Sequence, residues 1–150
     1  MKIKCLLATL TLLIVVSCNK NPNSQLTLKI TSVSGNVVPI GAQLQVTFDF
    51  TEKDNVIDTI GMIKLRINQD QTPTIRDTIF YGVPTYPKSS KGQLQLVLDH
   101  DFDLASAISP PTVGNPPINE SDSLILRFFA KDAGTNVSDT VNSGLIIVLR

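Results

Sequence analysis

The chain has 150 residues, of which 13 are basic, 13 are acidic and 42% are hydrophobic. This length is enough for one domain with a core of its own and too short for a multidomain assembly. A net charge of zero offers no electrostatic footprint for nucleic acid, and 17% charged residues with this much apolar content excludes a disordered chain. We therefore expect one folded domain with no nucleic-acid partner.

Residues 1–17 have the organisation of a secretory signal peptide. Lys2 and Lys4 supply positive charge, and a run of twelve apolar or weakly polar residues follows from Cys5 to Val16. A helix of this length spans about 18 Å, whereas the hydrocarbon core of a bilayer is about 30 Å thick. The segment is therefore expected to direct export and not to cross a membrane permanently.

The segment ends in Val15-Val16-Ser17-Cys18, which resembles the lipobox of bacterial lipoproteins. The resemblance implies cleavage after Ser17 and lipidation of Cys18. Cys5 leaves with the signal, so Cys18 would have no partner for an intramolecular disulfide. Two or more acyl chains would make the membrane anchor durable. Ordinary cleavage after Ser17, which would release a soluble secreted domain, is the alternative.

Residues 18–25 are polar after the cysteine and are expected to form a flexible tether. The tether is short, so it would hold the following domain, residues 26–150, close to the bilayer. Asn19 is not the aspartate that retains some lipoproteins in the inner membrane. The lipoprotein resemblance therefore implies the outer membrane of the cell envelope, and leaves open whether the domain faces the periplasm or the cell surface.

Alternation of apolar and polar residues predicts the strands of the domain. In each strand the apolar residues are expected to face the core and the residues between them, such as Lys64 and Arg66, to face water. Seven half-buried strands predict an all-β fold, an immunoglobulin-like or fibronectin III-like antiparallel β-sandwich. The rows are Leu26-Leu28-Ile30, Leu44-Val46-Phe48-Phe50, Ile63-Leu65-Ile67, Ile75 to Tyr81, Leu94-Leu96-Leu98, Leu124-Leu126-Phe128 and Leu145-Ile147-Leu149.

Two stretches depart from this regular pattern. Residues 108–118 contain four prolines, which cannot donate ladder hydrogen bonds, so we expect a long stiff loop there and no strand. Residues 103–108 are expected to form at most a short helical turn.

Two segments resemble the small immunoglobulin-like lipoproteins that are abundant in Bacteroidota. They are residues 46–57 (VTFDFTEKDNVI), a strand with an acidic turn, and residues 127–138 (RFFAKDAGTNVS), a strand with an Asp-x-Ala-Gly-Asn-like turn. Asn55 and Val56 replace a glycine and an acid of the family turn, and Thr135 interrupts the second motif. The resemblance implies a fold and a cellular location, and no activity.

The acidic turn raises the question of a metal site. Glu52, Asp54 and Asp58, with Asp132 from a neighbouring loop, are oxygen donors of the kind that bind Ca²⁺. Lys53 lies within this group, and the alternative is that these acids are solvated turn residues. We expect no cofactor other than this possible calcium ion.

Asp99, Asp101 and Asp103 are the basis of an enzymatic alternative, a small envelope hydrolase that uses their carboxylates. They imitate the start of an EF-hand loop, but Leu104 occupies the place of its glycine. His100 is the one histidine of the chain and a weak candidate for a catalytic base. We expect no enzymatic activity, and a binding or accessory module in its place.

Tyr81 and Tyr86 lie in a proline-stiffened stretch and are the candidate contacts for a protein or glycan partner. Their alternative role is packing at the edge of the core.

Four triplets resemble the Asp-Ser/Thr-aliphatic acceptor site for O-glycans in exported Bacteroidota proteins. A polar turn that enters an aliphatic strand produces the same triplet, and this is the structural alternative. The predicted acceptors are Thr59, Thr78, Ser123 and Thr140.

Overall fold

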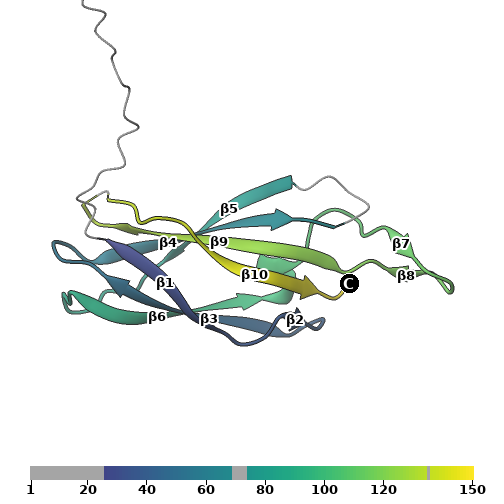
Figure 1. Cartoon of the computed structure of the whole chain (residues 1–150), viewed down its shortest axis with the longest axis horizontal. Coiled ribbons are helices and arrows are strands. Elements are labelled where there is room, and N and C mark those ends of the chain that lie inside the picture. The colour runs from purple at the N-terminus through teal and green to yellow at the C-terminus, as the bar shows by residue number, and fades with distance from the viewer. Residues whose placement is uncertain (1–25, 69–73, 135) are drawn as a thin grey trace, which may run out of the picture.

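The computed structural model describes residues 26–68, 74–134 and 136–150. The predicted signal peptide and tether, with Ser17 and Cys18, lie outside these residues. Figure 1 shows the strands along the chain, and a single helical turn, η1 (His100–Leu104), follows β6. The strands are β1 (Thr27–Val33), β2 (Val37–Val38), β3 (Gln43–Thr51), β4 (Ile57–Arg66), β5 (Thr74–Gly82), β6 (Lys91–Asp99), β7 (Thr112–Val113), β8 (Ile118–Asn119), β9 (Asp122–Asp132) and β10 (Val141–Val148).

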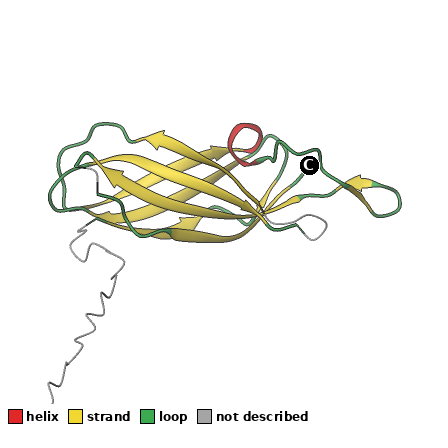
Figure 2. Ribbon diagram, turned by 90° about the horizontal axis from the view of Figure 1, so that it is seen from above, coloured by secondary structure: helices red, strands yellow, loops and turns green. Residues whose placement is uncertain are grey.

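Two sheets pack face to face and form the sandwich (Figures 1 and 2). Among the described residues, one sheet has three strands in the order β1-β3-β6, and the other has five in the order β2-β10-β9-β4-β5. Neighbours are antiparallel except β2, which runs parallel to β10. The all-β, immunoglobulin-like sandwich predicted from the alternation is confirmed, and the seven predicted rows lie in or beside the seven long strands.

The core lies between the two sheets. Val46, Phe48 and Phe128 are fully buried, and the rings of Phe48 and Phe128 meet edge-on across the sheets with centroids 5.0 Å apart. Leu124 and Leu126 point inward beside Phe128, as the alternation predicted. No tryptophan or disulfide takes part, so aliphatic and phenylalanine packing stabilises the sandwich.

The structure corrects the predicted facing of β4. Lys64 and Arg66 are buried, at 6% and 1% exposure, whereas Ile63 and Leu65 lie on the outer face and are half-buried. Arg66 Nε lies 2.8 Å from a carboxylate oxygen of the fully buried Asp122, so the inward charge has a partner of opposite sign. The same phase buries Ile60 and Met62 earlier in the strand, so the inward face of β4 is apolar first and carries paired charge near its end.

The phase of β10 is also the reverse of the predicted one. Ile146 and Val148 are buried, and Leu145 is 50% exposed. Every residue from Leu145 to Leu149 is aliphatic, so the sequence carries no alternation there that could select a face. Register with β9 decides it, since Ile146 pairs with the inward Leu124.

Two predicted irregularities also differ from the structure. The proline-rich segment contains a short hairpin, because β7 and β8 pair through Thr112 with Asn119 and Val113 with Ile118. The helical turn comes earlier than expected, at η1, where Asp99 caps it. No helix in the described ranges is both long enough and apolar enough to span a bilayer.

Candidate functional site

The candidate site is the open side of the sandwich, between the edge strands β5 and β6. Within the described sheets, β5 pairs only with β4, and β6 only with β3. Side chains of the two sheets therefore meet here without a further strand to cover them. Three hollows follow this side, two beside the segment after β5 and one beside η1.

The two hollows beside the segment after β5 form an apolar groove. The larger has a volume of about 340 Å³, and the smaller about 70 Å³. Val83, Pro84 and Leu94 line both, so the two are continuous. Tyr86 contributes to the larger and Tyr81 to the smaller, and we call the pair of hollows the tyrosine groove.

Both tyrosine hydroxyls are already engaged within the protein. Tyr86 Oη accepts a hydrogen bond from the backbone N–H of Ile57 at 2.8 Å, and its ring lies 5.8 Å from that of Phe50. Tyr81 Oη donates to Asp103 Oδ1 at 2.8 Å. Burial, this hydrogen bond and the charge of Asp103 together raise the pKa of Tyr81. Both hydroxyls are thus held within the protein, while Tyr86 and Tyr81 line the groove.

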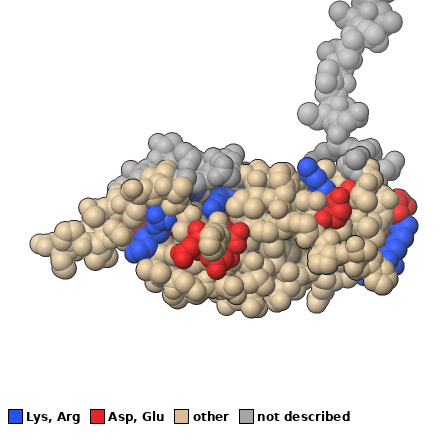
Figure 3. All heavy atoms as spheres, turned by 180° about the vertical axis from the view of Figure 1, so that it is seen from behind, with Lys and Arg blue, Asp and Glu red and all other residues tan. Residues whose placement is uncertain are grey.

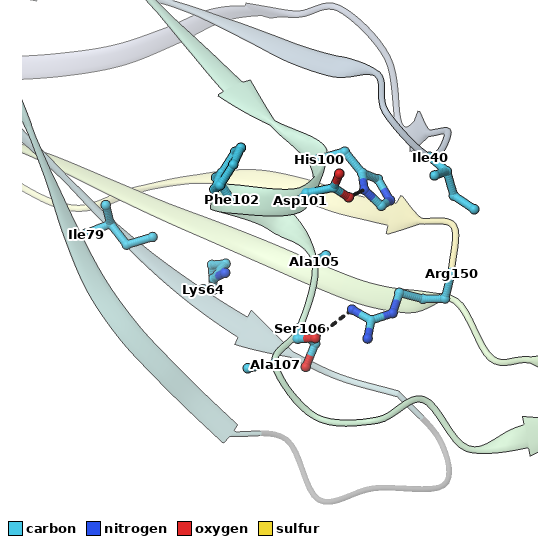
Figure 4. Close-up of a pocket in the computed structure, with 10 residues that line it drawn as sticks. All are labelled: Ile40, Lys64, Ile79, His100, Asp101, Phe102, Ala105, Ser106, Ala107 and Arg150. Carbon is cyan, nitrogen blue, oxygen red and sulfur yellow. Dashed lines mark hydrogen bonds and ion pairs between the residues drawn. The ribbon is translucent and has the colours of Figure 1, made fainter.

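The third hollow, with a volume of about 540 Å³, lies beside η1 (Figure 4). Ile79 from β5 and Phe102 from η1 form apolar walls, and His100, Asp101 and Arg150 form the polar end. Arg150 Nη1 donates to the carbonyl of Ser106 at 2.6 Å, so its guanidinium is held against the wall.

His100 connects η1 to the end of the chain. His100 is 3% exposed, with Nδ1 2.5 Å from Asp101 Oδ1 and Nε2 2.7 Å from the carbonyl oxygen of Leu149. Both ring nitrogens are therefore occupied by contacts within the protein. This geometry gives His100 a structural role at the junction of η1 with the segment after β10.

The three aspartates of the predicted hydrolase shape the turn. Asp99 Oδ1 accepts hydrogen bonds from the backbone N–H groups of Asp101 and Phe102, at 2.9 and 3.3 Å. Asp103 Oδ2 accepts from the backbone N–H of Asp99 at 2.7 Å, while Oδ1 accepts from Tyr81. Of these three carboxylates, Asp101 alone lines the cavity beside η1. The structure thus places them in turn formation and does not align them as a pair across a cleft.

The predicted calcium ligands are divided between two roles. Glu52 Oε1 accepts from the backbone N–H groups of Asp54 and Asn55, at 2.8 and 2.9 Å, and so closes the turn after β3. Asp54 and Asp58 are exposed. Within residues 26–68, 74–134 and 136–150, no three acidic, histidine or cysteine side chains form a group that could hold a metal ion.

Asp132 is the buried centre of the turn after β9. Its carboxylate accepts hydrogen bonds from the Asn136 backbone at 2.7 Å, from Asn136 Nδ2 at 2.7 Å and from Asn55 Nδ2 at 3.1 Å. Burial by itself raises the pKa of Asp132, but these hydrogen bonds and one from the Gly134 backbone outweigh it and hold the pKa below its ordinary value. The carboxylate therefore joins the two acidic turns.

The predicted O-glycan acceptors lie on or beside the five-stranded sheet. Thr59, Thr78 and Ser123 lie within β4, β5 and β9, and register places all three on the outer face. Thr78 is exposed, as is Thr140, which immediately precedes β10.

Sequence reasoning missed a buried polar network at the end of the sandwich that holds Arg150. Asp122 Oδ2 accepts from the Ser106 backbone N–H at 2.8 Å and from Arg150 Nη1 at 3.1 Å. Asn68 Oδ1 accepts from Arg66 Nε and from the Ser123 backbone, both at 2.9 Å. These residues are far apart in the sequence. The signals available were Asp122 before one apolar row, Arg66 within another and Arg150 after a third, and none of them shows that the three meet. Elsewhere, the surface in Figure 3 carries its charges in small separate groups.

No family model and no characterised protein sequence matches the chain. Among solved structures, it is similar to a β-glucosidase from Listeria innocua in complex with gluconolactone, with 12% identity and a TM-score of 0.40 over 85% of this chain and 16% of that chain. It is also similar to Spo0M, a sporulation control protein from Bacillus subtilis, with 10% identity and a TM-score of 0.38 over 84% of this chain and 50% of that chain. The chain thus spans less than two thirds of the length of either.

Proposed function

We propose that this chain is a lipoprotein of the cell envelope, anchored to the outer membrane through acylated Cys18, whose β-sandwich is a non-enzymatic binding or accessory module. The observation that carries the proposal is the lipobox Val15-Val16-Ser17-Cys18 directly behind an apolar run of signal-peptide length. The first described core residue, Leu26, follows Cys18 by eight positions. This spacing supports a domain held near the bilayer by a short tether.

The tyrosine groove is the proposed recognition site of the module. It combines aliphatic side chains with two tyrosine rings on the open side of the sandwich. Because their hydroxyls are held by Ile57 and Asp103, the rings are oriented before a ligand arrives. Pre-oriented aromatic rings suit a protein segment or a sugar ring, since little entropy is lost on binding.

We propose no second function. The hydrolase alternative required Asp99, Asp101 and Asp103 to act across one cleft, and two of these carboxylates accept hydrogen bonds that form the turn.

The anchor is tested by the intact mass of the mature protein from its native membrane. The expected mass is that of residues 18–150 plus acyl groups, because the lipobox directs both cleavage and acylation. The Cys18→Ala variant should lose the added mass and leave the membrane fraction. Cys5→Ala is the matched control, since Cys5 lies in the segment that is removed, and it should behave as the wild type. A mature wild-type protein with an unmodified thiol at Cys18 would contradict the lipid anchor and support the alternative, a soluble secreted domain.

A further inference from the structure

The two outer faces of the sandwich differ in chemistry. The outer face of the three-stranded sheet is polar, because the inward Leu44, Val46 and Phe48 of β3 alternate with hydrophilic residues. On β3 this face carries Gln43, Gln45, Thr47 and Asp49. On β6, Gln95 lies opposite Thr47 and Gln93 opposite Asp49, while the exposed Val97 opposite Gln45 is an apolar exception. This is the pattern expected of a sheet face in contact with water.

The outer face of the five-stranded sheet carries a group of apolar side chains beside the hydroxyls of Thr59, Thr78 and Ser123, and we call it the apolar face. Its side chains adjoin one another in register, since Leu65 pairs with Ile125, which in turn pairs with Leu145. Phe80 is 54% and Leu145 is 50% exposed. The other apolar side chains of this group are half-buried. Adjoining apolar side chains that are exposed in part mark an interaction surface. Its main residues are Phe80 on β5, Ile63 and Leu65 on β4, Ile125 and Phe129 on β9, and Leu145 on β10.

The reversed phase of β4 creates this face. The phase of β4 that buries Ile60 and Met62 also turns Lys64 and Arg66 inward. It leaves Ile63 and Leu65 on the outer face, where both are half-buried. The protein thus keeps two cations inside and two large aliphatic side chains outside. An apolar partner surface would remove Ile63 and Leu65 from water, and this would favour binding of the partner.

The charged side chains that β9 presents on the apolar face are both cationic. Arg127 lies between Ile125 and Phe129 in the strand, and Lys131 Nζ lies 4.8 Å from the ring centroid of Phe80 and 5.8 Å from that of Phe129. Apolar side chains accompanied by cations are typical of surfaces that lie in the interface of an anionic bilayer. A second copy on this face would bring the same cations into a shared interface, so the charges favour the lipid surface.

The described domain starts at the end of the sandwich where Lys131 lies. Thr27, the first residue of β1, pairs with Thr51, and Ile57, the first residue of β4, pairs with Asp132. Figure 1 shows the start of β1 at the same end as the loop that follows β9. Residues 18–25 span at most about 26 to 29 Å when extended. A lipid on Cys18 would therefore lie within reach of the edge of the apolar face.

We propose that the apolar face docks flat against the anionic surface of the bilayer to which Cys18 is attached. The inference rests on the proposed lipoprotein function and adds an orientation to it. The polar face of the three-stranded sheet then points away from the membrane. The tyrosine groove lies at the side, open to a partner in the aqueous phase.

The test uses residues 18–150, which contain every described strand and have Cys18 as their one thiol. Coupling this thiol to a maleimide lipid in vesicles supplies the anchor chemically, so the result does not depend on acylation in the cell. The chain has no tryptophan, so a single introduced one reports its own position. Leu145→Trp places it on the apolar face, and Gln95→Trp, also at an exposed site, is the matched control on the polar face.

The vesicles contain phosphatidylglycerol and a brominated lipid that quenches tryptophan on contact. We expect the Leu145→Trp variant to lose most of its emission and the Gln95→Trp variant to keep most of it. Replacing Arg127 and Lys131 with glutamine should restore emission in the Leu145→Trp variant. Equal quenching of the two tryptophan variants overturns the proposal, and so does an unquenched Leu145→Trp variant that sediments as a dimer. Failure of acylation in the cell, with docking intact in vitro, overturns the proposed function alone.

A second measurement concerns Thr78, an exposed predicted glycan acceptor that pairs with Ile63 on the apolar face. A glycan there would hold the face away from the lipid. The proposal therefore expects peptide mapping of the native protein to find Thr78 unmodified, and a glycan at this position contradicts it.

Discussion

Asp132 shows how a single carboxylate makes folding depend on pH. Its pKa in the folded protein is held below the value of about 4 that an aspartate has in an unfolded chain. The unfolded state therefore binds its proton first as the pH falls. The stabilisation is complete above about pH 4 and is lost as the pH decreases through the folded-state pKa.

The Asp132→Asn variant should be less stable than the wild type at neutral pH by about 1 to 3 kcal/mol, because hydrogen bonds to a charged acceptor are lost. It should also lose less stability than the wild type on acidification below about pH 4. Urea unfolding at neutral and acidic pH measures both. The exposed Asp54 is the matched control, and Asp54→Asn should change neither quantity. An unchanged acid dependence in Asp132→Asn would contradict the role given to its hydrogen bonds.

Asp122 allows Arg66 of β4 to face the interior, because it is the anionic partner of this guanidinium. Asp122→Ala leaves that guanidinium buried without the carboxylate, and the expected cost is about 3 to 5 kcal/mol. Asp122→Asn keeps hydrogen-bond acceptance and should cost less. The exposed Asp49, on the polar face, provides the control Asp49→Ala, whose effect should stay within about 0.5 kcal/mol. Denaturant midpoints would decide the order, and a cost for Asp122→Ala as small as the control would contradict the assignment.

At the scale of the strand, Gly61 of β4 pairs with Phe129 of β9 and lies beneath its aromatic ring. A Cβ added to Gly61 would lie 2.3 Å from Cζ of Phe129, so the ring rests directly on the glycine backbone. Phe80 packs edge-on against Phe129 with centroids 6.1 Å apart. An aromatic residue beside a strand glycine covers the backbone that the glycine leaves open.

Gly61→Ala should displace the Phe129 ring and destabilise the protein by about 1 to 3 kcal/mol, as overpacking does. Gly82→Ala is the matched control, because a Cβ there meets no atom within 4 Å. The cost of Gly61→Ala should largely disappear in a Phe129→Ala background, where the ring is absent. Thermal unfolding of the four proteins completes the cycle, and an equal cost in both backgrounds would show that the ring is not responsible.

The strands were predictable to different degrees for a physical reason. Alternation in β3 and β9 is strong, and their inward residues were predicted correctly. In β10 every residue of the row is aliphatic, so the row does not select a face. In β4 the row of Ile63 and Leu65 favours one phase, whereas Ile60 and Met62 favour the other, and a shift by one residue exchanges the two faces. The choice depends on pairing with β9 and on the buried Arg66–Asp122 pair, which involves residues far apart in the sequence.

At the scale of the whole molecule, the sandwich has three surfaces with different chemistry: a polar face, an apolar face and an open side with the tyrosine groove. The predicted site residues Tyr81 and Tyr86 lie together on the open side, whereas the predicted calcium ligands do not form a group in the described residues. Tyr81 and Tyr86 are five positions apart in the sequence, so local sequence already places them near each other. Whether acids from two turns converge depends on the hydrogen bonds that each carboxylate accepts in the folded protein, as Glu52 and Asp132 show.

Filling the tyrosine groove should prevent ligand binding to the whole molecule. Thr85 is exposed and lines the groove, so Thr85→Trp should fill it and leave the core intact. Thr27→Trp, at an exposed position of β1, is the control. We expect backbone amide resonances of Val83 and Leu94 to shift when a panel of soluble oligosaccharides and peptides is titrated. Thr85→Trp should abolish the shifts. Ligand binding that Thr85→Trp leaves intact would place recognition elsewhere.

The sequence by itself determined the local properties of this protein. Residues 1–18, with positive charge, an apolar run and a cysteine in this order, predict a location in the cell envelope. Alternation along each row predicts an all-β sandwich. Both signals depend only on residues that are close in the sequence. Only the tertiary structure decided which face of β4 and β10 is buried, that Arg66 and Asp122 meet, and that one outer face is apolar. Those outcomes depend on contacts between distant strands, because sheet register fixes which face of a strand meets the core and which charged side chains find a partner there.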